Sequence, residues 1–192
     1  MKLNLLETIK IQNGEPLYLS YHQSRLERSL NKLGCNSVYE LDKLINPPDN
    51  KLYRCRFVYN TTDFHIEYIP YAYSPINSLK LIESEEFDYS LKYEARQKLD
   101  ELFALREKCD DILIVIDSML TDTSKANVAF YDGSQWLTPS KPLLRGTTRE
   151  RYLNEKKIIE KPLHVSDIPS FEKVAVLNAM VDFCVLNNGI IP

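Results

Sequence analysis

The chain has 192 residues, of which 44% are hydrophobic and 27% are charged, and its formal net charge at pH 7 is −3. These proportions are those of an ordinary globular protein, and they exclude a collagen-like, disordered or low-complexity chain. The length allows one domain or two small ones. The missing basic excess argues against a nucleic-acid partner.

The cysteine, histidine and terminal patterns indicate a cytoplasmic protein without a metal site. None of the four cysteines forms a C-x-x-C pair, and the three histidines are too far apart for a typical metal-ligand spacing. The N-terminus lacks the apolar stretch of a signal peptide. The longest strongly apolar run, residues 112–116, is far shorter than the ~20 residues that cross a bilayer, so we expect no membrane partner.

The first half of the chain predicts a small α+β layer. Asn13-Gly14 predicts a hairpin turn after the first strand. Ser20 is expected to cap the following helix, with Gln23 as its capping-box partner and Gly34 as the residue that ends it. Three segments are predicted as strands: residues 3–12, 53–59 and 64–71.

A loop over residues 72–78 is the predicted boundary between two subdomains, 1–74 and 75–192. Beyond the loop we expect a helix over about residues 91–108. The segment 112–116 is apolar throughout, which predicts a strand buried on both faces. Three further elements are expected in the second part: a hairpin around Asp132-Gly133, a helix from about Thr148, and a core strand over residues 173–177.

The segment Gly146-Thr147-Thr148 has the features of an anion site. Gly146 permits a tight turn, and Thr147 can cap the following helix with Glu150 as its capping-box partner. A helix N-terminus with unpaired amides and nearby hydroxyls attracts anions. The alternative is that Thr147 only caps its helix.

Five other positions carry chemistry that the local sequence does not assign. Arg25 could be an ordinary exposed helix arginine. Lys92 and Arg96 share one face of the expected helix, where like charges four residues apart repel unless an anion lies between them. Nothing local selects Lys92 as a nucleophile. Asp122 follows the most buried strand and Asn178 ends another apolar segment, so a loop turn and a structural cap are their simplest interpretations.

The order of these motifs is more specific than any one of them. From about residue 5 to residue 180 it resembles the class IV pyridoxal-phosphate aminotransferases, which include branched-chain aminotransferases, D-amino acid aminotransferases and aminodeoxychorismate lyases. The motifs that carry the resemblance are, in order, Glu7-Thr8 ahead of Asn13-Gly14, His22-x-x-Arg25-Leu26, Lys92-x-x-x-Arg96, Thr121-Asp122-x-Ser124-x-x-Asn127, Thr138-Pro139 and Leu144-x-Gly146-x-Thr148-Arg149.

The resemblance implies an α/β fold of the D-amino acid aminotransferase type, with pyridoxal 5′-phosphate between two subdomains. Residues 1–74 would form the small α+β subdomain, and residues 75–192 a larger α/β pseudo-barrel that carries the cofactor lysine. Lys92 would be that Schiff-base lysine. Asp122 would face the pyridinium nitrogen, where the family usually has Glu, and Arg56 falls near a position that meets the substrate carboxylate. The positions that match phosphate-binding residues are Arg25, Gly146, Thr147, Thr148 and Asn178.

The implied activity is that of an aminotransferase, or of a 4-amino-4-deoxychorismate lyase that releases pyruvate. The substrate would be a small amino acid or amino-carboxylate, and the family resemblance implies a homodimer. Family members usually carry additional residues ahead of the Glu7-Thr8 position, so the chain resembles a short, N-terminally truncated member. That shortness and Asp122 leave open a non-catalytic binding or scaffold protein of the same fold. A purely structural interaction module is the third possibility.

Overall fold

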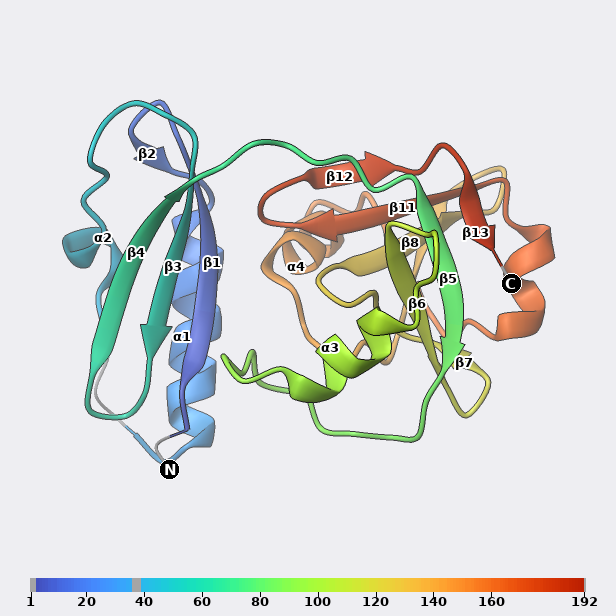
Figure 1. The fold of residues 1–192 in the computed structure, drawn as a ribbon, viewed down its shortest axis with the longest axis horizontal. Coiled ribbons are helices and arrows are strands. Elements are labelled where there is room, and N and C mark those ends of the chain that lie inside the picture. Colours follow the sequence, from blue (N-terminus) through green and yellow to red (C-terminus); the bar gives the residue numbers. More distant parts are fainter. Residues whose placement is uncertain (1–2, 36–38, 192) are drawn as a thin grey trace. The chain divides into compact units, whose positions relative to one another are not determined.

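A computed structural model describes residues 3–35 and 39–191, and its chain divides into two compact units (Figure 1). The first unit contains residues 1–73 together with 91–95, and the second contains 74–90 together with 96–192. The division after Tyr73 falls one residue before the end expected for the N-terminal subdomain. Residues 91–95 return to the first unit, so the expected continuous second subdomain is interrupted by the segment that contains Lys92.

The first unit is a four-stranded sheet with a helix along one face (Figure 1). The sheet has the order β2-β1-β3-β4, and β1 is antiparallel to both of its neighbours. Alternate residues of β1 are buried, as a strand with one face on a core requires. The elements are β1 (Leu5–Gln12), β2 (Glu15–Pro16), α1 (Leu19–Lys32), α2 (Leu41–Leu44), β3 (Tyr53–Tyr59) and β4 (Phe64–Pro70).

Helix α1 begins differently from the expectation. Tyr18, in the left-handed backbone conformation with φ of 54°, is the N-cap, and no side chain caps the helix. Ser20 already lies inside the first turn, and its carbonyl accepts a hydrogen bond from the Ser24 hydroxyl. The predicted capping box of Ser20 and Gln23 is therefore wrong. The reason is that the short return strand β2 turns the chain into the helix at Tyr18, before Ser20 is reached.

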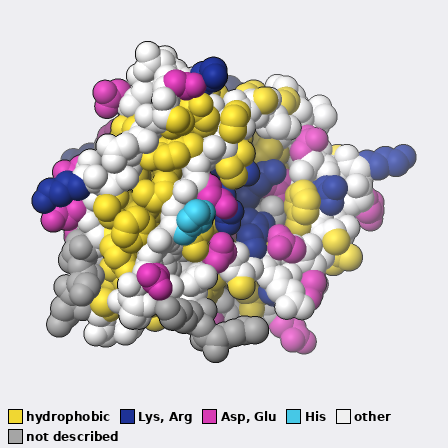
Figure 2. Space-filling model, turned by 60° about the vertical axis from the view of Figure 1, so that its left-hand side comes forward, with side chains coloured by type: hydrophobic (Ala, Val, Ile, Leu, Met, Phe, Trp, Pro, Cys, Tyr) yellow, Lys and Arg dark blue, Asp and Glu magenta, His cyan; other side chains and the backbone are white. Residues whose placement is uncertain are grey.

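The first unit also presents apolar surface. It is turned forward in Figure 2, which shows a broad area of hydrophobic side chains flanked by acidic and basic ones. Phe64 on the edge strand β4 is 42% exposed, yet it stacks on the buried Phe57 with the ring centroids 5.3 Å apart. The aromatic residues of this layer therefore contribute to both its core and its surface.

The second unit is built on two sheets that share one core (Figure 1). One sheet has the order β10-β9-β8-β11-β12 and the other has the order β13-β5-β6-β7. The core contains Leu113 and Val115 from β6 and Phe130 and Val176 from the larger sheet. The elements are β5 (Ser78–Glu83), α3 (Gln97–Ala104), β6 (Asp111–Ile116), β7 (Met119–Leu120), β8 (Asn127–Tyr131), β9 (Trp136–Pro139), α4 (Thr147–Asn154), β10 (Ile159–Lys161), a 3₁₀ helix (Val165–Ser170), β11 (Lys173–Asn178), β12 (Asp182–Val185) and β13 (Gly189–Ile191).

Four predictions for this unit are confirmed and one is wrong. The helix expected from about Thr148 is α4, and the core strand expected over residues 173–177 is β11. Strand β6 is buried on both faces, and β8 and β9 form the hairpin around Asp132-Gly133. The helix expected over residues 91–108 is only α3, Gln97–Ala104. Residues 91–95 are not helical because their backbone pairs with the first unit: the Leu6 amide donates to the Lys92 carbonyl over 2.8 Å, and the Glu94 amide donates to the Asn4 carbonyl over 3.0 Å. No helix among the described residues is both long enough and apolar enough to span a bilayer.

Candidate active site

The expected site residues fall into two groups, one in each unit. The second unit contains five of them: Asp122, Gly146, Thr147, Thr148 and Asn178. The first unit contains Arg25, Arg56 and Lys92.

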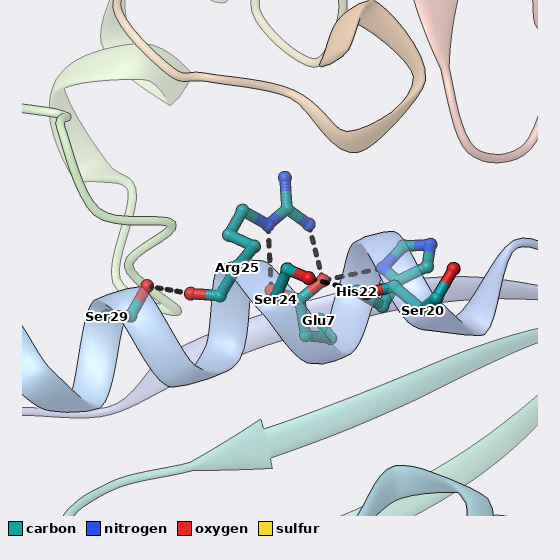
Figure 3. Close-up of polar contacts among 6 residues, drawn as sticks. All are labelled: Glu7, Ser20, His22, Ser24, Arg25 and Ser29. Atoms are coloured by element: carbon teal, nitrogen blue, oxygen red, sulfur yellow. Dashed lines mark hydrogen bonds and ion pairs between the residues drawn. The ribbon is translucent and has the colours of Figure 1, made fainter. Parts of the chain in front are cut away.

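Arg25 is held by a buried carboxylate rather than exposed on the helix (Figure 3). It projects from α1 toward Glu7 of β1, which is fully buried. The Nε of Arg25 donates to Glu7 Oε1 over 2.8 Å and its Nη2 donates to Glu7 Oε2 over 2.5 Å. A bidentate pair of this kind fixes both the position and the plane of the guanidinium. The ordinary surface-arginine interpretation is therefore wrong for Arg25.

His22 completes this cluster from the same helix (Figure 3). Its Nδ1 lies 2.6 Å from Glu7 Oε2. Burial would raise the pKa of Glu7, but the charge of Arg25 and the hydrogen bonds from His22 and Arg25 outweigh it and lower that pKa to about 2. Glu7 is therefore ionised, so His22 Nδ1 carries the proton and donates it. Burial lowers the pKa of His22 itself, and the imidazole is accordingly neutral near pH 7.

Lys92 lies in a short segment that meets the start of β1 through backbone hydrogen bonds and one isolated bridge. Its carbonyl accepts from the amide of Leu6, the residue before Glu7, and Tyr93 forms a bridge with Leu5. The positive charge of Lys92 is one of the causes that lower the pKa of His22, after burial. Backbone pairing thus fixes the chain at Lys92 although this residue is on no helix.

Arg56 is engaged by two carboxylates of its own unit. Its Nη1 donates to Glu67 over 2.6 Å, and its Nη2 donates to Glu94 over 3.3 Å. On β3 it alternates with Cys55 and Phe57, which belong to the core beneath α1. Because successive side chains of a strand point to opposite faces, Arg56 lies on the face away from Arg25. The structure does not bring these two arginines together.

Asp122 is a buried carboxylate that receives hydrogen bonds from amides. Its Oδ1 accepts from the side-chain amide of Asn127 over 2.7 Å, and its Oδ2 accepts from the Leu144 amide over 2.9 Å. Burial raises the pKa of Asp122 to about 6, although these amides and the charge of Arg149 act in the opposite direction. Among the described residues no salt bridge involves Asp122. Burial therefore favours the neutral form of Asp122, and a cation beside the carboxylate would stabilise its ionised form.

The turn before α4 presents backbone amides and buried hydroxyls. Gly146 is the N-cap, in extended conformation, and no side chain caps the helix. Thr147 and Thr148 are both buried in the first turn. The prediction that Thr147 caps this helix is therefore wrong, because the chain is already helical at Thr147. The first-turn amides together with these hydroxyls form the type of helix N-terminus that binds anions.

Asn178 ends β11 and has a structural role in the turn that follows. Its Oδ1 accepts from the amides of Met180 and Val181 over 2.9 and 3.1 Å. Its Nδ2 lies 3.4 Å from the carbonyl of Lys125, in the loop that follows Asp122. The side chain therefore caps its strand, as the simplest interpretation expects, and also contacts the Asp122 loop.

Three residues of these clusters had no role in the sequence interpretation: Glu7, His22 and Asn127. Each lies inside a motif that carries the family resemblance, and the motif gives its position but not its contacts. For Asn127, the spacing of five residues from Asp122 across a tight turn is a local signal. Glu7 and Arg25 are 18 positions apart on different elements, and no local pattern indicates that pairing.

Removing the charge of Glu7 is expected to destabilise the protein. Glu7→Gln removes the ionised carboxylate that the buried Arg25 contacts, which costs about 3–5 kcal/mol of unfolding free energy. Glu67→Gln is the control, since the ion pair between this half-exposed glutamate and Arg56 is worth about 1 kcal/mol or less. Glu7 has a folded pKa of about 2 against an ordinary value of 4.5, so its stabilisation is complete above pH 4.5 and is lost as the pH falls toward 2.

Urea unfolding of the wild-type protein and both variants between pH 7 and pH 2 measures this effect. The stability gap between wild type and Glu7→Gln should narrow below pH 4.5. Equal losses for the two variants, or a gap that does not change with pH, would contradict the ion-pair account.

Comparison with known proteins identifies the family of the chain. The model for amino-transferase class IV matches residues 73–184. An uncharacterized protein of Haemophilus influenzae is 37% identical over 182 residues, which cover 92% of this chain and 97% of that protein. A crystal structure from Haemophilus somnus 129PT, assigned only provisionally as a 4-amino-4-deoxychorismate lyase, is 35% identical with a TM-score of 0.88, covering 94% of this chain and 97% of the other.

A more distant structure supports the fold alone. A hypothetical aminotransferase of Mycobacterium tuberculosis, solved in a form with bound pyridoxal phosphate, is 14% identical with a TM-score of 0.79 and covers 97% of this chain and 80% of its own. The mixed α/β fold is thus the one found in class IV aminotransferase and aminodeoxychorismate lyase structures. The family model covers more than half of the chain, and one relative exceeds a third identity over nearly its full length. The chain belongs to the class IV aminotransferase family.

Proposed function

We propose that this protein is a pyridoxal-phosphate-dependent enzyme that acts on an amino-carboxylate through Lys92. The observation that carries the proposal is the buried Asp122 carboxylate, which is surrounded by amide donors and whose pKa burial raises to about 6. A carboxylate in that environment gains from a cationic partner. The protonated ring nitrogen of pyridoxal phosphate is such a partner, and a fold relative from Mycobacterium tuberculosis was solved with this cofactor bound.

The chain also contains groups suited to the cofactor phosphate. Gly146, Thr147 and Thr148 offer first-turn amides and hydroxyls at the start of α4. We assign Arg25 the same ligand, because Glu7 fixes its guanidinium in one orientation. Asn178 would act on this site through the Lys125 loop that it contacts. These groups bind and orient but take no part in proton transfer.

Lys92 is the residue that we assign to the chemistry. When bound, the cofactor supplies an aldehyde that captures amines and a ring that withdraws electrons from the carbon being deprotonated. The Lys92 amine would anchor the cofactor, be displaced by the substrate amine, and then carry a proton to or from the substrate. Asp122 would hold the ring nitrogen in its protonated state throughout. Exclusion of water around Asp122 strengthens that ion pair.

The lyase reaction is the first candidate within this class. The Haemophilus somnus relative carries a provisional 4-amino-4-deoxychorismate lyase assignment and is 35% identical over nearly its whole length. Aminotransfer begins with the same capture of an amine by the cofactor, so it is the alternative reaction for the same residues. Arg56 is proposed as a contact for a substrate carboxylate, in which case its ion pairs with Glu67 and Glu94 would have to open.

Covalent trapping tests the role of Lys92. After incubation with pyridoxal phosphate and reduction with borohydride, peptide mass spectrometry should find the cofactor mass on the peptide that contains Lys92, because reduction makes its link to the aldehyde permanent. Lys92→Ala should lose the label. Lys10→Ala, a lysine of β1 in the same unit, is the matched control and should keep it. An unlabelled wild-type protein, or a label confined to another lysine, would contradict the assignment.

Product analysis tests the reaction. With 4-amino-4-deoxychorismate as substrate, we expect pyruvate to form, measured through coupled oxidation of NADH by lactate dehydrogenase, and we expect Lys92→Ala to form none. Transfer of an amino group to a 2-oxo acid without pyruvate release would identify the aminotransferase instead. A protein that binds the cofactor but converts no member of an amino acid panel would exclude both reactions and leave a binding role.

A further inference from the structure

Asn127 connects Asp122 to the turn that begins α4. Its side-chain Nδ2 donates to Asp122 Oδ1 over 2.7 Å and to the Leu144 carbonyl over 2.8 Å. The Leu144 amide in turn donates to Asp122 Oδ2 over 2.9 Å. Asp122 and Asn127 also pair through their backbones as a β-bridge. The three residues therefore form a closed ring of hydrogen bonds.

Gly146 fits against this ring because it has no side chain. A Cβ atom built on Gly146 would lie 2.0 Å from Asn127 Oδ1, far inside van der Waals contact. The side chain of Asn127 therefore occupies the space beside the N-cap of α4. Its NH₂ group contacts the carboxylate, and its oxygen lies against the backbone of Gly146, which Thr147 and Thr148 follow.

We infer that Asn127 is a positioning residue that fixes the Asp122 carboxylate and the Gly146 turn in one arrangement, so that the ring-nitrogen partner and the phosphate-binding amides are set together. This inference rests on the proposed function, because it takes the ligand of Asp122 to be the pyridine nitrogen. Asn127 itself touches neither the reacting atoms nor the substrate. It acts through Asp122 and Leu144.

The chemistry of the amide explains why asparagine suits this place. One NH₂ group supplies two donors, and both are used here, on the carboxylate and on a carbonyl. Leucine has a similar shape but no donor, so it would leave Leu144 O and Asp122 Oδ1 each without this bond. Aspartate would bring a second carboxylate against Asp122, and one of the two would have to be protonated.

A carboxyl titration of the cofactor-free, full-length protein tests the hold on Asp122. With ¹³C-labelled aspartate, the Asp122 signal is assigned by its loss in Asp122→Asn and followed by NMR against pH. We expect a wild-type midpoint near 6, and in Asn127→Leu a midpoint higher by about one pH unit, a tenfold gain in proton affinity. The reason is that a donor to the ionised form is lost. Asn127→Ser retains one hydrogen-bond donor, so its Asp122 midpoint should shift less. This variant also keeps the test decisive if the leucine variant does not fold.

Thr121→Val is the matched control for this titration. It removes a buried hydrogen bond of 2.7 Å to the Ile114 carbonyl, one residue away from Asp122 but not directed at it. It should leave the Asp122 midpoint unchanged. A midpoint that does not move in Asn127→Leu and Asn127→Ser, or that moves equally in Thr121→Val, overturns the inference.

Cofactor affinity tests the second half of the inference. In an absorbance titration with pyridoxal phosphate, the Kd of Asn127→Leu should be at least about tenfold higher than the Kd of the wild type. Thr121→Val should bind as the wild type does. The loss in Asp122→Asn combined with Asn127→Leu should be smaller than the product of the two single losses, because both residues belong to one network; fully multiplicative losses would overturn the inference. If the wild type binds no cofactor, the proposed function fails, while the carboxyl titration still decides whether Asn127 holds Asp122.

Discussion

Burial of the Asp122 carboxylate is the constraint on which the second unit's site depends. An ionised carboxylate withdrawn from water is costly unless it is paired and hydrogen-bonded. Here amides from Asn127 and Leu144 supply the hydrogen bonds, and the pKa of Asp122 still rises to about 6. The local fold follows from this need: β8 begins at Asn127, the chain returns at Leu144, and Gly146 leaves room for the amide. A positively charged partner would therefore stabilise the ionised carboxylate.

At Glu7, charged partners offset the cost of burying an ionised carboxylate. Glu7 is equally buried, but Arg25 and His22 contact it directly, and its pKa falls to about 2. Two buried carboxylates with pKa values on opposite sides of their ordinary range have different tasks. Glu7 already has its cation and so fixes Arg25 in place. Asp122 has only neutral donors within hydrogen-bond reach among the described residues, which is what a binding partner for an incoming cation requires.

Local sequence patterns predicted the elements that are determined by residues adjacent in the chain. The apolar run 112–116 predicted a buried strand, and Asp132-Gly133 predicted a hairpin. Both predictions depend only on the residue types at adjacent positions. The prediction of a helix from residue 91 is wrong because Lys92 pairs through its backbone with Leu6. The spacing of apolar residues cannot reveal such a contact. The order of motifs identified the family, but it did not reveal that Glu7 holds Arg25. Such partners depend on how distant strands and helices meet.

The central claim is that Asp122 pairs with a positively charged cofactor ring. The most direct measurement is an absorbance titration of the purified protein and of Asp122→Asn with pyridoxal phosphate at pH 7.5. The account predicts a saturable visible band in the wild type and a Kd that is about 30-fold or more weaker in Asp122→Asn, because a buried charge pair loses one partner. Equal affinity in the two proteins, or no uptake of cofactor by the wild type, would contradict it.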